Sequence, residues 1–114
     1  MLGGQVRQGS PDLVGPATTL MLERLTADVA FLGSEGIDPA RGSFAQNFET
    51  AEIARRMAAA SRRVVVVADG SKVGRPGNVL YAPIGEIDEL ITDRSGALAT
   101  VRVLRRKGVA VTLV

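Results

Sequence analysis

The chain has 114 residues, of which 46% are hydrophobic and 23% charged, a balance typical of one globular domain. It contains no cysteine and no histidine, which excludes a disulfide framework, a thiolate metal site and catalysis by histidine. The net charge of +2 comes from arginines interspersed with acidic residues, no apolar run reaches membrane-spanning length, and no signal peptide is recognised. We therefore expect a cytoplasmic protein with no membrane partner and no cofactor.

The first part of the chain predicts two short elements. Residues 1–15 are rich in glycine and contain a Ser-Pro-Asp turn signal. Within them, Leu13-Val14 predicts a short strand, and Met1-Leu2 is interpreted as the stump of a strand that is cut short. Residues 16–26 predict a helix, for which Pro16 suits the first turn. The apolar spacing places its inward face at Thr18, Met21, Leu22 and Leu25.

The middle of the chain predicts a strand, a loop and the clearest helix. The apolar run over residues 27–33 indicates a strand, followed by a Gly-Ser-Glu-Gly loop. Residues 37–48 show no period, so we expect a long loop that is functional or mobile. Residues 49–62 predict a helix with Glu49 and Glu52 in its first turn and Arg62 and Arg63 at its end, as the helix dipole favours.

Four consecutive valines in residues 64–67 form the most distinctive stretch, RRVVVVADGSK. A short β-branched run with polar ends indicates a strand buried on both faces of a parallel sheet. Ligands of open α/β sheets bind outside the carboxyl ends of the strands, which is where Asp69 and Lys72 fall. The plainer interpretation is an ordinary Asp-Gly-Ser turn with a solvated lysine.

The last part predicts alternating elements. We expect strands over residues 78–82 and 90–92, with one helical turn over residues 86–89 between them. Ser95 is expected to cap a helix over residues 96–107, which Gly108 ends and which places Leu98, Val101 and Leu104 inward. A buried strand over residues 109–114 completes the chain. Strands alternating with helices predict an α/β fold with a mostly parallel sheet flanked by helices.

The order of these motifs resembles the sensor domain of DeoR-family bacterial transcriptional regulators. The motifs are Gly3-Gly4, Gly15-Pro16, ADVAFLGSEGID, Gly42, AEIARRM, RRVVVVADGSK, EIDELITD and KGVAVTLV. The resemblance implies a fold similar to ribose-5-phosphate isomerase, incomplete at its N-terminal side. It also implies a domain that binds a phosphorylated sugar and controls operator binding, usually in a repressor of carbohydrate catabolism. Relative to that family, the winged helix-turn-helix and the opening strands with their phosphate-binding loop are absent from the sequence.

The resemblance also implies ligand-contacting residues. Lys72 would offer a positive charge to a phosphate or sugar oxygen. Asp28 matches an acidic position that faces the sugar, and Glu52 matches an acid of the family's helix, although a helix N-terminal charge would explain it as well. Gly33 and Gly36 would let their loop close over the ligand. Asp69 would orient Lys72 or cap the turn, and Asp93 is expected to be structural.

Two departures from the family pattern affect these contacts, and other functions stay open. Gly70 stands where a serine is more usual, and Ala54 where the family often has lysine. A sugar-phosphate isomerase is one alternative, since carboxylates and a lysine suit proton transfer. A dimerisation module without a ligand is another, because an uncovered edge strand invites pairing with another chain. We expect the protein to be a homo-oligomer. Direct DNA binding is the least favoured, because the arginines are scattered among acids.

Overall fold

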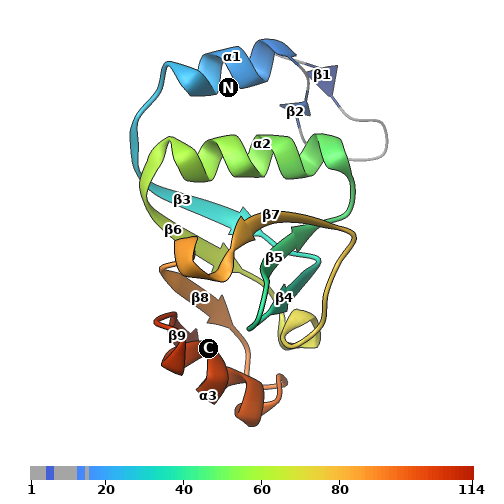
Figure 1. Ribbon diagram of the computed structural model, residues 1–114, viewed down its shortest axis with the longest axis vertical. Coiled ribbons are helices and arrows are strands. Elements are labelled where there is room, and N and C mark those ends of the chain that lie inside the picture. Colours follow the sequence, from blue (N-terminus) through green and yellow to red (C-terminus); the bar gives the residue numbers. More distant parts are fainter. Residues whose placement is uncertain (1–4, 7–12, 15) are drawn as a thin grey trace.

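The computed structural model describes residues 5–6, 13–14 and 16–114 of the chain, and Figure 1 shows its elements. The helices are α1 (Pro16–Glu23), α2 (Phe48–Ala59) and α3 (Leu98–Arg106), with short 3-10 turns η1 (Gly70–Lys72) and η2 (Ile84–Glu86). The strands are β1 (Gln5–Val6), β2 (Leu13–Val14), β3 (Ala27–Gly33), β4 (Gly36–Asp38), β5 (Gly42–Ala45), β6 (Ser61–Val67), β7 (Val79–Pro83), β8 (Glu89–Thr92) and β9 (Ala110–Leu113). No helix in these ranges is long and apolar enough to cross a membrane.

The centre of the molecule is a four-stranded parallel sheet in the order β3-β6-β8-β9. The predicted α/β class with a mostly parallel sheet and packed helices is thus confirmed. Each strand lies next to the following one, so right-handed crossovers place α2 and α3 on the same face of the sheet. One buried cluster joins both helices to alternate strand residues, which is consistent with that arrangement: Ala51, Ala58 and Leu104 with Ala30, Leu32, Val64, Val66 and Leu90.

The opposite face of this sheet is open at β3 and at the carboxyl end of β6. Its residues include Val29, Phe31 and Val67, whose exposed fractions are 37%, 63% and 46%. Val65 in the middle of the face is buried, and beside it Arg63 donates a 2.8 Å hydrogen bond to Glu89. The expectation that the valine strand is buried on both faces is therefore wrong at Val67, because the described residues place no helix over that end.

A second, antiparallel sheet of three strands, β4-β5-β7, lies beside the parallel one (Figure 1). The expectation of a long loop over residues 37–48 is wrong, because β4 and β5 form a hairpin there. Its turn is held by Asp38, whose side chain accepts a 2.8 Å hydrogen bond from the Ala40 backbone N–H. Pro39 and Gly42 belong to this turn, and Ile37 and Phe44 are fully buried, so the proline and glycine mark a tight connection and not an irregular segment.

Several expected boundaries near the C-terminus also change. The 3-10 turn is η2, and Glu89 opens β8. Helix α3 begins at Leu98, and Ser95 does not cap it because its backbone N–H and hydroxyl both bond to Asp93. Leu98 is 59% exposed, whereas Val101 and Leu104 face the core as expected. The last strand is an edge strand and not a buried one, while Gly108 ends α3 with the expected positive φ of 98°.

The first two helices also differ from the expectations in their buried faces and their ends. Thr18 and Leu22 are buried in α1, but Met21 and Leu25 are 40% and 49% exposed, because α1 packs on α2 with a narrow stripe. Helix α2 ends at Ala59, so Arg62 and Arg63 lie in β6 and do not close the helix. Asn47 caps α2 by accepting a 2.8 Å bond from the Thr50 N–H. The predicted strand at Leu13-Val14 is confirmed as β2, and Met1-Leu2 lies outside the described residues.

Candidate functional site

The carboxyl ends of β3 and β6 bring together two segments that are far apart in sequence. Gly33 at the end of β3 pairs with Val67 at the end of β6. The chain continues from these ends into Ser34-Glu35 and into η1, which contains Lys72. The Lys72 Nζ atom lies 3.7 Å from Glu35 Oε2, and the two side chains are 26% and 50% exposed. A partly accessible lysine and carboxylate thus mark the edge where ligands of parallel sheets bind.

Glu35 is a site residue that sequence reasoning missed. Its position directly after the β3 strand was the available signal, because it follows the strand as Asp69 follows β6. The Glu35 backbone N–H donates a 2.9 Å hydrogen bond to the Phe44 carbonyl, which fixes the start of the side chain. The contact with Lys72 joins segments that follow two different strands, β3 and β6, so no local pattern could show it.

Asp69 holds the turn in which Lys72 lies. Its Oδ1 atom accepts a 3.0 Å hydrogen bond from the Ser71 backbone N–H and a further bond from the Ser71 hydroxyl. The Lys72 backbone N–H donates to the Asp69 carbonyl at 3.1 Å. Of the two roles considered for Asp69, these contacts support the turn cap, and they position the Lys72 backbone without touching its ammonium group.

Asp93 supports the same turn from the end of β8. It accepts hydrogen bonds from the backbone N–H of Gly70 at 3.1 Å and of Ser95 at 2.8 Å, and from the Ser95 hydroxyl. The Ser95 hydroxyl is the main reason that the pKa of Asp93 lies below its ordinary value, and the two backbone donors add to it. Asp93 therefore acts on the loop backbone, as expected for a structural residue.

Position 70 requires a glycine, because η1 packs closely against the turn that contains Asp93 and Ser95. A Cβ atom there would overlap Gly96 N and Ser95 Oγ and would lie 2.7 Å from Asp93 Oδ1. The departure from the family's serine is thus matched by the tight packing of the Asp93 turn against η1. The backbone N–H groups of η1 are also committed, since Gly70 donates to Asp93 and Ser71 to Asp69. The charge of Lys72 is therefore what this loop offers to an anion.

The two predicted loop glycines have different environments. Gly33 is exposed and has open space where a Cβ would be. Gly36 is buried, and a Cβ there would overlap the Arg75 carbonyl oxygen and lie 2.8 Å from the Pro76 carbonyl carbon. Between them, Ser34 Oγ donates to the Gly36 carbonyl at 2.7 Å. Closure of this loop over a ligand stays a prediction, and Gly33 is the end with room to move.

Two buried hydroxyl groups hold the loop that contains Gly33 and Ser34 by hydrogen bonds. The Tyr81 hydroxyl donates a 2.8 Å hydrogen bond to the Gly33 carbonyl, and Ser43 Oγ donates to Ser34 Oγ at 2.8 Å. Tyr81 is 2% exposed and Ser43 fully buried. Burial raises the pKa of Tyr81 to about 12, against the opposing effect of a hydrogen bond with Ser43. Nothing in the local sequence singled out these two residues.

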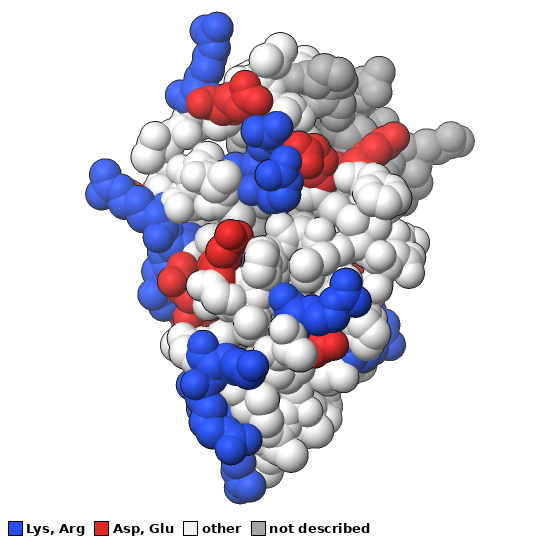
Figure 2. All heavy atoms as spheres, viewed as in Figure 1, with Lys and Arg blue, Asp and Glu red and all other residues white. Residues whose placement is uncertain are grey.

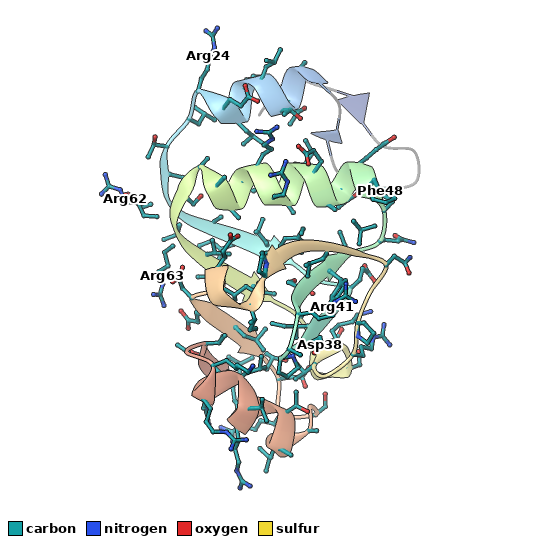
Figure 3. All side chains as sticks on the ribbon, in the orientation of Figure 1. Arg24, Asp38, Arg41, Phe48, Arg62 and Arg63 are labelled. Atoms are coloured by element: carbon teal, nitrogen blue, oxygen red, sulfur yellow. The ribbon has the colours of Figure 1, made fainter. Side chains whose placement is uncertain are left out.

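Asp28 and Glu52 lie away from this group. Asp28 is at the amino end of β3, five residues or roughly 16 Å before Gly33, with its side chain 91% exposed and 3.9 Å from Arg62 Nη1. Figure 3 shows Arg62 extending outward at that end of the sheet. Glu52 on α2 pairs with Arg55 at 3.0 Å and Arg56 at 2.9 Å, and Arg56 also reaches Glu23 of α1 at 3.5 Å. Arg56 is the main reason that the pKa of Glu52 is lowered, so the contacts of Glu52 are those of a helix ion-pair network.

A cavity of about 370 Å³ lies elsewhere, between the carboxyl ends of α1 and α2 and the start of β6. Its lining includes Leu22, Leu25, Arg56, Ala59 and Ser61, and none of the six predicted contact residues. This is the amino end of the parallel strands, opposite to Lys72. Within the described ranges, no cluster of acidic side chains could hold a metal ion.

Comparison with known proteins gives consistent similarities. A family model described as the DeoR C-terminal sensor domain matches residues 1–94. The HTH-type transcriptional regulator GlpR of Haloferax volcanii is 38% identical over 93 residues, which are 82% of this chain and 36% of that protein. The HTH-type transcriptional repressor GlcR of Bacillus subtilis is 33% identical over 96% of this chain and 42% of its own length. The glycerol-3-phosphate regulon repressor of Escherichia coli is 28% identical over 91% of the chain and 41% of its own length. The chain thus spans about two fifths of the length of these relatives.

Proposed function

Because this chain belongs to the DeoR C-terminal sensor domain family, we propose that it binds a phosphorylated sugar at the carboxyl edge of its parallel sheet. Lys72 is the proposed anion contact, and the placement of its side chain beside Glu35 at this edge is the observation that carries the proposal. In the longer regulator, the bound effector would favour one arrangement of the protein and so change operator binding by an N-terminal helix-turn-helix. We place the regulator in the cytoplasm, where it acts without catalysis.

The weak pairing of Lys72 supports this role. At 3.7 Å, its contact with Glu35 is longer than a hydrogen bond, and Glu35 is its only ion-pair partner among residues 16–114. A solvent-accessible pair of this kind stabilises a protein by only about 0–1 kcal/mol. A phosphate group could therefore replace Glu35 at little energetic cost. The relative named for the glycerol-3-phosphate regulon is consistent with a small phosphorylated ligand.

The rest of the phosphate contacts would come from outside the described loops. The backbone N–H groups of η1 are bonded to Asp69 and Asp93, so they do not form an anion cradle. The family resemblance implies a separate phosphate-binding loop that precedes this part of the sensor. For the chain alone we therefore expect measurable but weak binding, in the millimolar range. Asp28, Glu52 and the two loop glycines stay proposals of lower rank, since their contacts do not converge on Lys72.

Thermal unfolding with and without a panel of sugar phosphates tests this function. A ligand that binds only the folded state raises the unfolding free energy by about 1.4 kcal/mol at ten times its Kd, which moves the midpoint by roughly 6 °C. We expect a rise with at least one phosphorylated sugar and none with the same sugar lacking phosphate.

The chain contains two lysines, which gives a matched control. Lys72→Ala should abolish the rise, whereas Lys107→Ala, at the exposed end of α3, should retain it. A cooperative transition that no phosphorylated sugar moves, or a rise that survives Lys72→Ala, would contradict the proposed site.

Self-association is the second part of the proposal. Parallel sheets are normally covered on both faces, but Phe31 and Val67 leave part of one face exposed, and β3 has a free edge within the described residues. We therefore propose that the protein is a homo-oligomer. Light scattering coupled to gel filtration would show a dimer or larger species whose dissociation constant rises in Phe31→Ser. A strictly monomeric chain at high concentration would contradict this part while leaving the ligand site intact.

A further inference from the structure

The charges of this chain are unevenly distributed along the sequence. Residues 94–114 contain five Lys and Arg and no acidic residue, whereas residues 1–93 contain nine Lys and Arg and twelve Asp and Glu. The basic C-terminal part therefore carries +5, and the rest of the chain −3. The match to the family model ends at residue 94, so this segment also lies almost entirely beyond it.

Helix α3 gathers most of this charge on one side. Arg102, Arg105 and Arg106 are spaced three and four residues apart and are exposed, as is Lys107 after the last turn. Val101 and Leu104 occupy the opposite side and are buried in the core. Figure 2 shows these basic side chains along the lower tip of the molecule, below the acidic side chains visible in that view. We call this surface, Arg102, Arg105, Arg106 and Lys107, the basic face of α3.

The basic face lacks internal neutralisation. Among residues 16–114, none of its four cations lies in an ion pair, and Arg105 donates a 3.0 Å hydrogen bond to the Val111 carbonyl. Cations near a helix C-terminus stabilise the helix dipole, which accounts for one or two of them. It does not account for Arg102 in the middle of α3 or for the lack of any acid over 21 residues.

The composition of this surface indicates which class of partner it fits: a membrane, a protein or a nucleic acid. A membrane-binding helix presents an apolar face beside its cations, but the apolar side of α3 is already buried in the core. A protein interface is enriched in aromatic anchors, and residues 94–114 contain no aromatic residue. Leu98 is the one large apolar side chain of α3 that is exposed, so the surface is mainly arginine. Clustered arginines fit repeated phosphate groups, to which guanidinium groups bind in a bidentate manner.

We propose that the basic face of α3 binds the phosphate backbone of duplex DNA without sequence preference. It would give the regulator an electrostatic contact with DNA that is separate from its operator-reading domain. This inference depends on membership in a family of transcriptional regulators, but not on the ligand site at Lys72. Arg102, Arg105 and Arg106 are thus grouped on α3, beyond the last acidic residue of the sequence.

Fluorescence anisotropy of a labelled 20-base-pair duplex, titrated with the chain between 20 and 200 mM salt, tests the proposal. Three to four phosphate contacts predict a slope of log K against log salt of about −3 to −4. Arg102→Glu with Arg106→Glu should weaken binding at least tenfold at 20 mM salt and reduce the slope by about 2. These two side chains are exposed and lack protein partners among the described residues, so the thermal midpoint should stay close to that of the parent chain.

A control variant carries the same change in net charge at the opposite end of the molecule. Arg24→Glu with Arg62→Glu alters exposed arginines near the amino end of β3, as labelled in Figure 3, and should weaken binding less than threefold with an unchanged slope. Equal losses in the two double variants would overturn the proposal, as would a parent chain without salt-dependent binding. Displacement of DNA by polyglutamate at equal charge concentration would also overturn it, in favour of an acidic protein partner.

The outcome is independent of the proposed sensor function. The double variants leave Lys72 and its loop unchanged, so stabilisation by a phosphorylated sugar should be the same in both. Loss of DNA binding with retained sugar-phosphate binding would support the basic face. Retained DNA binding in the α3 variant would refute the basic face whatever the sugar-phosphate result.

Discussion

The two faces of the parallel sheet are built from the same strands but have opposite environments. On the covered face, Leu90 is fully buried and belongs to the core cluster that includes residues of α2, α3 and the small sheet. On the open face, Phe31 of β3 is 63% exposed. Both are large apolar residues in strands, so local propensity does not separate them. The difference arises because right-handed crossovers place both helices on one side of the sheet. Topology therefore decides which of the strand residues are buried.

The largest expected loss of stability comes from a substitution on the covered face. Leu90→Ala should reduce the free energy of unfolding by about 2–5 kcal/mol, because it removes a fully buried side chain and leaves a cavity. Phe31→Ala on the open face is the matched control and should cost less than about 1 kcal/mol in the monomer. Urea unfolding of the two variants at low protein concentration gives both values. Equal losses would show that something covers the open face in solution.

A second prediction concerns the single tyrosine of the chain, which lies on the covered side. Burial raises the pKa of Tyr81 to about 12, so the folded chain should show no tyrosinate absorbance while the pH passes through 10, where the unfolded chain ionises. The folded state then holds a proton that the unfolded state loses, and stability should fall as the pH rises from about 10 towards 12.

Spectrophotometric titration at 295 nm in native buffer and in urea measures this difference. Tyr81→Phe should remove the stability loss in this pH range, and it should cost about 1 kcal/mol at neutral pH because the Gly33 carbonyl loses its donor. A native titration midpoint near 10 would show that the Tyr81 hydroxyl is accessible to solvent and does not hold the Gly33 loop.

The smallest expected effect belongs to the open face. The Arg63 guanidinium is the main reason that the pKa of Glu89 lies below its ordinary value, and the Thr112 hydroxyl adds to the shift. A lowered folded pKa stabilises the protein above the unfolded pKa, and that contribution is lost as the pH falls through the folded value. Stability should therefore decrease below about pH 4.5 slightly more in the parent chain than in Arg63→Ala. Identical acid profiles would show that the ion pair is not formed in solution.

Part of the fold and one residue of the candidate site could be predicted from the sequence. The valine run, Gly108 and the alternation of strands with helices predicted the α/β fold, because each depends on local pattern. The position of Lys72 at a carboxyl strand end was predicted in the same way. The hairpin of β4 and β5 was not, because Pro39 and Gly42 indicate a tight turn and an irregular loop equally well.

The contacts that define the site depend on register between distant strands. Glu35 meets Lys72 only because Gly33 pairs with Val67, and Tyr81 supports Gly33 from 48 residues away. Asp28 was proposed from the family resemblance; it lies at the other end of β3 from Gly33, and its contact with a ligand stays a prediction. The basic face of α3 was missed because the charge was averaged over the whole chain, although residues 94–114 contain five cations and no acid.

The proposed contact between Lys72 and a phosphorylated ligand can be measured directly, because the chain contains only two lysines. In protein labelled with ¹⁵N-lysine, the amide spectrum should contain two signals, from Lys72 in η1 and Lys107 after α3. Titration with the sugar phosphate that stabilises the fold should shift the Lys72 signal with saturation, leave Lys107 in place, and have no counterpart with inorganic phosphate at equal ionic strength. A Lys72 signal that stays fixed, or that moves only together with Lys107, would contradict the proposed site.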